Sequence, residues 1–124
     1  MLGPIGQISM NAHDIERATA FYSDVLNLPL LFRAGQMSFF DCGGVRLMLS
    51  RPEKPEYDHP GSVLYFTVAD IEAMHRQLLD RGVTFLGDPH LIARMPDHEL
   101  WMAFFTDTEG NTLALMTEKR QAGR

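Results

Sequence analysis

The 124-residue sequence lacks several features that mark whole classes of protein. Cys42 is its only cysteine, so no internal disulfide can form, and we expect a reducing compartment, the cytoplasm. A lone cysteine in an apolar stretch is more often an inert core residue than a reactive thiol. No apolar run approaches a membrane-spanning length, and the N-terminus has no basic region followed by an apolar one. We therefore expect neither export nor membrane insertion.

Positive charge and the common catalytic loops are also scarce. Sixteen acidic and eleven basic residues give a formal charge of −5, and the basic residues are scattered along the chain. We therefore expect no nucleic-acid partner. The sequence contains no nucleophile-elbow motif and no glycine-rich phosphate-binding motif, which argues against serine hydrolases and nucleotide-binding loops. A hydrophobic content of 45% and a charged content of 22% are typical of a globular protein.

The sequence repeats itself at an offset of 56 residues. The tripeptide Asp-Ile-Glu at 14–16 recurs at 70–72 (70 − 14 = 56), and each copy follows a stretch in which every second residue is apolar. Such a stretch predicts a strand, an aspartate suits a helix N-cap, and apolar residues at helical spacing predict a helix. We expect helices over 14–26 and 70–81.

Each expected helix has one apolar stripe. The two stripes are Ile15, Ala18, Phe21, Tyr22 and Val25, and then Ile71, Met74, Leu78 and Leu79. Pro29 prevents continuation of the first helix, and Gly82 lies where a left-handed C-terminal cap is expected. His75 falls on an exposed helical face in this pattern, and His13 and His59 lie in polar surroundings. We expect these three histidines to be solvated.

Three strand-like stretches follow each helix. In the first half they are 30–33, 37–41 and 45–51, with a hairpin turn at Gly43-Gly44, and in the second half they are roughly 84–95, 100–106 and 112–117. Aligning Gly44 with Gly110 gives an offset of 66 (110 − 44 = 66), so the second copy carries about ten additional residues, which we place in a hairpin over 90–99. The order of one strand, one helix and three strands occurs twice. This order excludes a parallel doubly wound sheet and predicts an α+β fold.

Strand alternation assigns side chains to two faces. The uniformly apolar face, expected under the helices, contains Ile8, Met10, Leu47, Leu64, Phe66 and Leu113. The mixed face, expected to line a groove, contains Gln7, Ser9, Arg46, Met48, Val63, Tyr65 and Ala114. We expect one domain over 1–124, with module one at about 4–51, a linker at 52–61, module two at about 62–118 and a C-terminal tail at 119–124.

Three segments resemble the vicinal oxygen chelate superfamily. They are the two strand-helix openings at 8–22 and 64–83, and the turn and final strand at 107–115, which begins Asp-Thr-Glu-Gly-Asn. The resemblance implies two tandem βαβββ modules that form a curved mixed sheet with a central groove. The superfamily includes glyoxalase I, extradiol dioxygenases, fosfomycin-resistance enzymes, epimerases and metal-free bleomycin-binding proteins. Shared fold does not fix activity.

Enzymes of that superfamily typically hold a divalent metal with His or Glu at four strand positions. The matching residues here are Gln7, Met48, Val63 and Ala114. A thioether or an amide is a poor metal ligand, and Val and Ala cannot bind metal. We therefore expect no metal and no other cofactor.

Other residues keep two functions open. Tyr65 and Arg46 are suited to orient an anionic or aromatic small-molecule ligand, and Trp101 either stacks on a flat ligand or packs at the domain edge. One hypothesis is therefore a metal-free small-molecule binding protein. The other is an enzyme of glyoxalase, dioxygenase or epimerase type, with relocated metal ligands or with acid-base catalysis by His90, His98 or Glu99.

Assembly follows from the open strand edges that small separate sheets leave. Edges of this kind favour pairing, and a two-fold arrangement is the commonest symmetric solution, so we expect a homodimer. The phenylalanines at 39, 40, 104 and 105 support this expectation weakly, because one face of their strands needs a cover. The alternative is that they fill the monomer's core.

Overall fold

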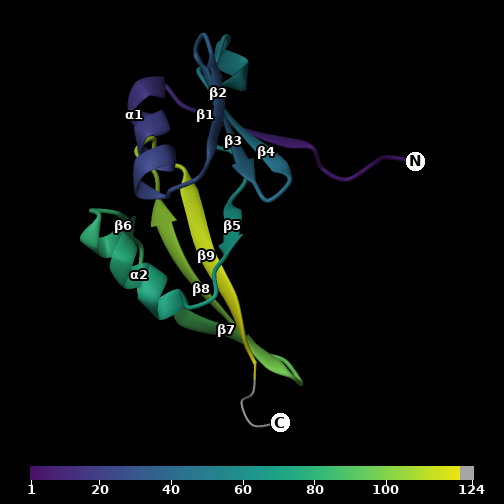
Figure 1. The fold of residues 1–124 in the computed structure, drawn as a ribbon, viewed down its shortest axis with the longest axis vertical. Helices are drawn as coiled ribbons and strands as arrows, with labels where there is room; N and C mark the ends of the chain where they lie inside the picture. Colours follow the sequence, from purple (N-terminus) through teal and green to yellow (C-terminus); the bar gives the residue numbers. More distant parts are fainter. Residues whose placement is uncertain (121–124) are drawn as a thin grey trace. The chain divides into compact units, whose positions relative to one another are not determined.

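Each repeat of the sequence forms its own sheet with its own helix (Figure 1). The structure, a computed structural model, describes residues 1–120 and divides into two compact units, unit one over residues 1–61 and unit two from residue 62 onward. The division falls at the end of the expected linker. That both units belong to one domain remains a prediction.

Unit one contains the elements β1 (Gln7–Asn11), α1 (Ile15–Ala20), the π-helical turn η1 (Phe21–Val25), β2 (Leu30–Ala34), β3 (Met37–Cys42), β4 (Val45–Ser50) and the 3-10 turn η2 (Pro55–Tyr57). Its sheet has the order β1-β4-β3-β2, in which β1 is parallel to β4 and the other pairs are antiparallel. The loop between β3 and β4 has two residues, Gly43 and Gly44, with φ of 64° and 97°. A tight hairpin turn with two positive φ angles favours glycine at both positions, so the expected turn is confirmed.

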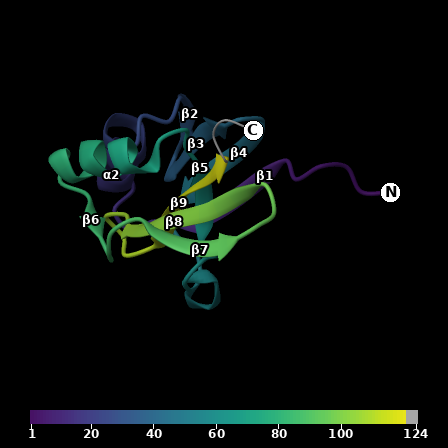
Figure 2. The same cartoon turned by 90° about the horizontal axis from the view of Figure 1, so that it is seen from below.

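Unit two contains the elements β5 (Leu64–Thr67), α2 (Ile71–Asp80), β6 (Thr84–Phe85), β7 (His90–Arg94), β8 (His98–Thr106) and β9 (Thr112–Arg120). Its sheet has the order β5-β9-β8-β6, and β7 pairs with β8 as the hairpin that the ten additional residues predicted (Figure 2). Lys119 and Arg120 belong to β9 and not to a tail; residues 121–124 of the expected tail lie outside the described residues.

The α+β class and the two βαβββ modules are thus confirmed. The strands lie in two sheets, one in each unit, where the sequence suggested one curved sheet. The reason is that the first strand of each module pairs in parallel with the last strand of the same module, β1 with β4 and β5 with β9, so each module completes its own sheet. None of the helices in the described residues is both long enough and apolar enough to cross a membrane.

Aspartate caps begin both helices, as predicted. The Asp14 carboxylate accepts a hydrogen bond from the Arg17 backbone N–H at 3.1 Å, and the Asp70 carboxylate accepts one from the Ala73 N–H at 3.0 Å. Each cap satisfies a backbone donor that has no partner within the helix. The first helix continues beyond Ala20 as η1, where the Leu26 N–H donates to the Phe21 carbonyl at 3.0 Å. This wider turn is one that the sequence pattern did not predict.

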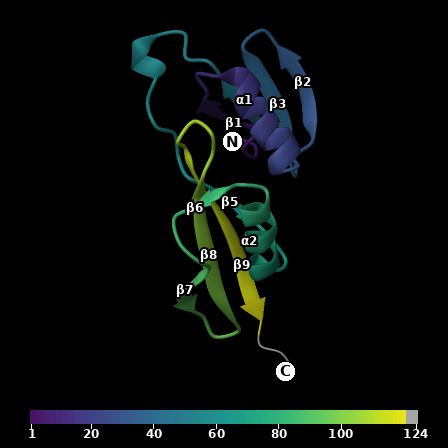
Figure 3. The same ribbon diagram turned by 90° about the vertical axis from the view of Figure 1, so that its left-hand side faces the viewer.

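The apolar helix-facing positions form the core of each unit. Leu47 and Leu49 in unit one, and Leu113 and Leu115 in unit two, are buried. Figure 3 shows α2 lying along one side of β8 and β9. Two of the four phenylalanines that were expected to support a dimer lie in the core instead. Phe40 contacts Tyr22, and Phe105 contacts Phe85, so both rings fill the core of their own unit.

The buried stripe of α2 differs from the prediction. His75, expected to be solvated, is only 8% exposed, whereas Leu79, expected in the stripe, is 46% exposed and Met74 is partly exposed. The face that meets the sheet passes through Ile71, His75 and Leu78, which are spaced as neighbours on one helix side. His75 takes an apolar position because its ring packs edge-on against Phe85, with 4.4 Å between ring centres.

Candidate functional site

Four residues singled out in the sequence lie on the sheet face of unit one that points away from α1. This surface is called the non-helical face of unit one. Parallel pairing places Gln7 opposite Arg46, and Ser9 opposite Met48. The Arg46 Nε–H donates to Gln7 Oε1 at 2.7 Å. The Gln7 Nε2 lies 3.8 Å from the Met48 sulfur, a weak contact. Arg46, Gln7 and Met48 thus form a small connected cluster, and Ser9 lies beside Met48 in the neighbouring strand.

An aromatic pair extends this cluster. Phe39 lies opposite Met48 in the sheet, and its ring stacks on the Phe32 ring with 4.3 Å between centres and 19° between planes. The Arg46 guanidinium lies over the Phe39 ring, 5.4 Å from its centre. Contact with an aromatic face stabilises a cation and helps to fix its position. The sequence assigned Phe39 either to a dimer interface or to the monomer's core; its alternation with the core residue Phe40 is the signal that places it on this face.

The non-helical face of unit two brings together a different set. Tyr65 lies opposite Ala114, which lies opposite Phe104 on its other side. The rings of Tyr65 and Phe104 meet edge-on at 6.0 Å, and the His90 ring lies 6.1 Å from Phe104. Tyr65 is 46% exposed and Ala114 is fully buried. Val63 immediately precedes β5 and is exposed. This face is aromatic and apolar.

Trp101 does not share a face with Tyr65 and Ala114, although the sequence analysis grouped the three as ligand-binding candidates. Trp101 and the buried Ala103 are two residues apart on β8, and side chains at that spacing point to the same face of a sheet. Trp101 therefore lies on the face that α2 covers. Its indole N–H donates to Glu99 Oε1 at 3.0 Å, and the Lys119 ammonium lies over its ring at 4.1 Å. Lys119 also pairs with Glu72 of α2 at 2.7 Å. These contacts match the edge-packing alternative.

The proposed acid-base residues do not form one cluster. His98 and Glu99 are adjacent in β8 and therefore point to opposite faces. His98 Nδ1 lies 2.8 Å from Asp97 Oδ1 and its Nε2 lies 3.7 Å from Glu118, while Glu99 pairs with Arg94 at 2.7 Å. The hydrogen bond with His98 and the positive charge of Arg120 lower the pKa of the Asp97 carboxyl.

The side chains that the resemblance places at the family's four metal positions are poor ligands for a divalent ion. Gln7 and Met48 offer an amide and a thioether, and Val63 and Ala114 offer no donor atom. The Arg46 guanidinium, itself a cation, bonds the only side-chain oxygen among these four residues. Among residues 1–120, moreover, no group of three His, Cys, Asp or Glu side chains is arranged so that it could hold a metal ion.

Cys42 is partly buried, and burial together with the neighbouring Asp41 charge raises the pKa of its thiol. A raised pKa keeps the thiol protonated at neutral pH, whereas the thiolate is the nucleophilic form. This environment agrees with an inert cysteine, as the sequence suggested.

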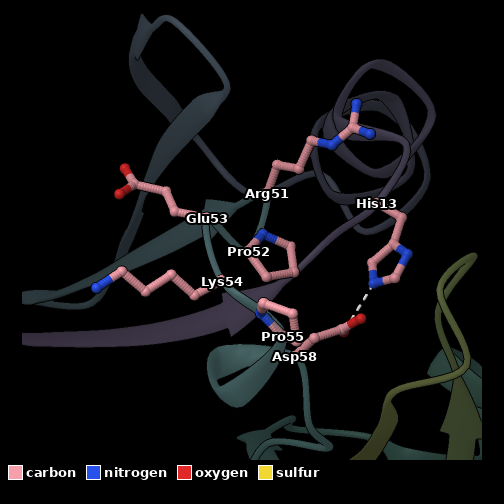
Figure 4. A pocket seen from close by; sticks show the side chains of 7 residues that line it. All are labelled: His13, Arg51, Pro52, Glu53, Lys54, Pro55 and Asp58. Carbon is pink, nitrogen blue, oxygen red and sulfur yellow. Dashed lines mark hydrogen bonds and ion pairs between the residues drawn. The ribbon is translucent and has the colours of Figure 1, made fainter.

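A shallow cavity of about 290 Å³ lies beside the linker in unit one (Figure 4). His13, expected to be solvated, pairs there with Asp58, with 2.7 Å between Nε2 and Oδ1. The Arg51 side chain points one way, and Glu53 and Lys54 extend to the side opposite His13 (Figure 4). Ligand sites usually have polar groups that converge. These groups diverge, so the non-helical faces are the stronger candidates.

Comparisons with known proteins agree with this fold. A sequence model of the Glyoxalase/Bleomycin resistance protein/Dioxygenase superfamily matches residues 4–115, so the chain belongs to that superfamily. The resemblance noted in the sequence is thereby confirmed.

Two relatives and one solved structure illustrate the range of similar proteins. A glyoxylase-like domain-containing protein of Didymella fabae is 30% identical over 125 residues, covering 93% of this chain and 94% of the relative. Glutathione transferase FosA of Serratia marcescens is 27% identical over 121 residues, covering 93% and 81%. A superfamily member from Sphaerobacter thermophilus has a TM-score of 0.77 at 23% identity, covering 94% and 98%; at this identity the match concerns the fold alone.

Proposed function

We propose that the protein binds a small organic molecule without the divalent metal that its family's enzymes use. The observation that supports the metal-free part of the proposal is the contact between Arg46 and Gln7, 2.7 Å from Nε to Oε1. A guanidinium at this position repels a second cation, and the neighbouring Met48 adds only a thioether. The proposal further includes a cytoplasmic location, in keeping with the single cysteine.

The composition of both non-helical faces supports a small organic ligand. Small-molecule sites are mostly apolar or aromatic, with a few polar groups that orient the ligand. Unit one offers Met48 and the stacked Phe39 and Phe32 rings near Arg46, and unit two offers Tyr65 beside Phe104. The residues proposed to contact ligand are Gln7, Ser9, Arg46 and Met48 on the face of unit one, and Val63 and Tyr65 on the face of unit two; Ala114 is fully buried and is left out. Trp101 is left out of this set because it contacts Glu99 and Lys119 on the other face.

Metal content tests this proposal most directly. Protein purified without chelator is analysed for Mg, Mn, Fe, Ni and Zn, and its melting temperature is measured with and without each ion. We expect far less than one ion per chain and no metal-dependent stabilisation. A bound ligand at a hundredfold excess over its dissociation constant would stabilise the protein by about 2.7 kcal/mol, so a melting screen of organic molecules supplies the positive arm. A stoichiometric ion that raises the melting temperature would overturn the proposal.

An acid-base enzyme that needs no metal is the second candidate. The observation that favours it is the shared contact of the His90 imidazole and the Tyr65 phenol with the Phe104 ring, at 6.1 and 6.0 Å. These two groups can exchange protons with a substrate. An activity screen in the presence of chelator tests it, with His90→Gln expected to abolish turnover. His98→Gln is the matched control, because that histidine is engaged by Asp97 and Glu118 at the hairpin tip.

The proposal also includes a homodimer of about 28 kDa, twice the 14.0 kDa of the chain. Support comes from the edge strand β2, where Leu30, Leu31 and Phe32 are 42%, 51% and 46% exposed. An exposed apolar edge favours pairing with another strand. Sedimentation at micromolar concentration tests the dimer, and a monomer that does not change with concentration would exclude it.

A further inference from the structure

Arg46 is the one charged member of the cluster on the non-helical face of unit one. Two contacts position its guanidinium: the hydrogen bond from Nε to Gln7 Oε1 and the Phe39 ring beneath it at 5.4 Å. Phe39 is itself held in place, because it is 7% exposed and stacked on Phe32. A side chain that is fixed before a ligand arrives loses little conformational entropy on binding.

The two terminal nitrogens of Arg46 are available to a ligand. Within residues 1–120, the structure records no hydrogen bond or ion pair at Nη1 or Nη2, and Arg46 is an exposed residue. Asp41 lies directly opposite Arg46 in the sheet. Its carboxylate instead accepts a hydrogen bond from the Gly44 N–H at 3.1 Å, in the turn that follows β3. The nearest cross-strand acid therefore does not neutralise Arg46 through a direct ion pair.

We propose that Arg46 binds the carboxylate of an organic ligand whose flat apolar body lies against Phe32 and Met48. This inference rests on the proposed function and adds the chemical class of the ligand. Because Gln7 occupies Nε, the carboxylate is received end-on by the parallel N–H groups of Nη1 and Nη2. Arg46 thus supplies a positive charge beside Gln7 and Met48, two of the positions that the resemblance assigns to metal ligands.

The chemistry of the surrounding residues selects this ligand class. Because β3 lies between β2 and β4, the Phe39 ring separates Phe32 from Arg46. Phe32 is 46% exposed and stacked on Phe39, so it offers an aromatic edge across which a flat ring can lie in an edge-to-face contact. Met48 is an adaptable apolar side chain that tolerates different ring shapes. A carboxylate is planar and matches the guanidinium fork, whereas a neutral amide of the same shape forms weaker hydrogen bonds because it carries no charge.

Calorimetric titration with 2-naphthoate and 2-naphthamide tests the inference, since the two probes share one ring system and differ in charge. We expect the carboxylate to bind about tenfold to a hundredfold more tightly than the amide, from the strength of hydrogen bonds between charged groups. R46Q should remove this preference, so that the acid and the amide bind with similar, weak affinities. R46K, which keeps the charge but loses the fork, should give an intermediate affinity.

Two further variants sharpen the test. Gln7→Leu removes the acceptor that positions Nε and should weaken naphthoate binding by roughly threefold, because it loosens the guanidinium without removing its charge. Arg76→Gln is the matched control: it removes an exposed positive charge from α2 in the other unit and should change neither affinity. Circular dichroism and melting curves verify that each variant is folded.

The outcomes separate this inference from the proposed function. Equal binding of acid and amide by the unaltered protein, or an R46Q variant that retains the preference, would overturn the role of Arg46. Failure of both probes to bind at millimolar concentration would overturn it as well. None of these results concerns metal content, so the proposed function would then still be judged by elemental analysis and the wider ligand screen. A stoichiometric metal would instead remove the function on which the inference rests.

Discussion

The two units share one plan of elements but carry different chemistry on one face of that plan. At an offset of 66, Leu47 corresponds to Leu113 and Leu49 to Leu115, and all four side chains are buried. On the other face, Arg46 corresponds to Thr112 (46 + 66 = 112), so the charged cluster of unit one has no counterpart in unit two. Packing requirements kept the helix-facing residues alike, whereas the non-helical faces diverged.

Buried polar groups show the same divergence. Thr19 of α1 and His75 of α2 occupy equivalent positions (75 − 19 = 56), and each is 8% exposed. The Thr19 hydroxyl bonds the Ile15 carbonyl at 2.6 Å and the Ser38 hydroxyl at 2.5 Å. His75 instead packs its ring against Phe85. A polar residue at this position is thus tolerated in both units, but it is stabilised by hydrogen bonds in one and by ring packing in the other.

The largest expected effect is in the cores, where the units are most alike. Phe40 lies opposite Leu47 and Phe105 opposite Leu113, and both rings are essentially fully buried. Phe40→Ala and Phe105→Ala should each lower the free energy of unfolding by about 3–5 kcal/mol, through lost burial and the cavity left behind. Urea unfolding measures this loss.

Leu79→Ala is the control for the core substitutions. Its side chain is 46% exposed, so its truncation should cost roughly 0.5 kcal/mol or less. A Leu79→Ala variant as unstable as Phe105→Ala would mean that α2 buries the stripe originally expected from the sequence and not the one through His75.

A smaller effect is expected at the helix caps, which repeat in both units. Asp14→Ala and Asp70→Ala should each cost about 1 kcal/mol, because each removes an acceptor for a backbone N–H of the first helical turn. Asparagine at the same positions retains an acceptor and should restore most of the stability. If alanine were neutral at one position only, the helix starts would not be equivalent, and the comparison between the units would fail there.

Much of the fold could be predicted because it depends on local signals that repeat. The Asp-Ile-Glu tripeptides give both helix starts, and the Gly43-Gly44 turn gives a hairpin. The wider turn η1 has no such signal, because it depends on one extra residue accommodated between α1 and β2. A polarity pattern places His75 on the exposed side of α2 because histidine is polar, whereas its ring fills an apolar position beside Phe85.

The candidate site could be predicted only in part. Alternation correctly grouped Gln7 with Arg46 and Tyr65 with Ala114, because pairing partners on one face follow from the period of a strand. The position of Trp101 after the hairpin suggested that it joins this group. Its spacing of two residues from the buried Ala103 places it on the other face. The Arg46–Gln7 hydrogen bond depends on parallel strand register, which a single sequence does not specify.

The smallest expected effect concerns an ion pair that distinguishes the helices of the two units. Glu16 of α1 pairs with Arg33 of β2 at 3.0 Å, whereas its counterpart Glu72 pairs with Lys119 of β9. The hydrogen bond and charge of Arg33 lower the pKa of the Glu16 carboxyl. The pair therefore contributes its stability above the pKa of an unfolded glutamate and loses it as pH falls through the lowered pKa of the folded state.

A double-mutant cycle with Glu16→Gln and Arg33→Gln should show a small favourable coupling energy at neutral pH, and this coupling should disappear in acid. It should also weaken in 1 M salt, because both groups are in contact with solvent. Unfolding curves measured across this pH range check the prediction, and a coupling independent of pH would show that packing of the Arg33 side chain, and not its charge, joins α1 to β2.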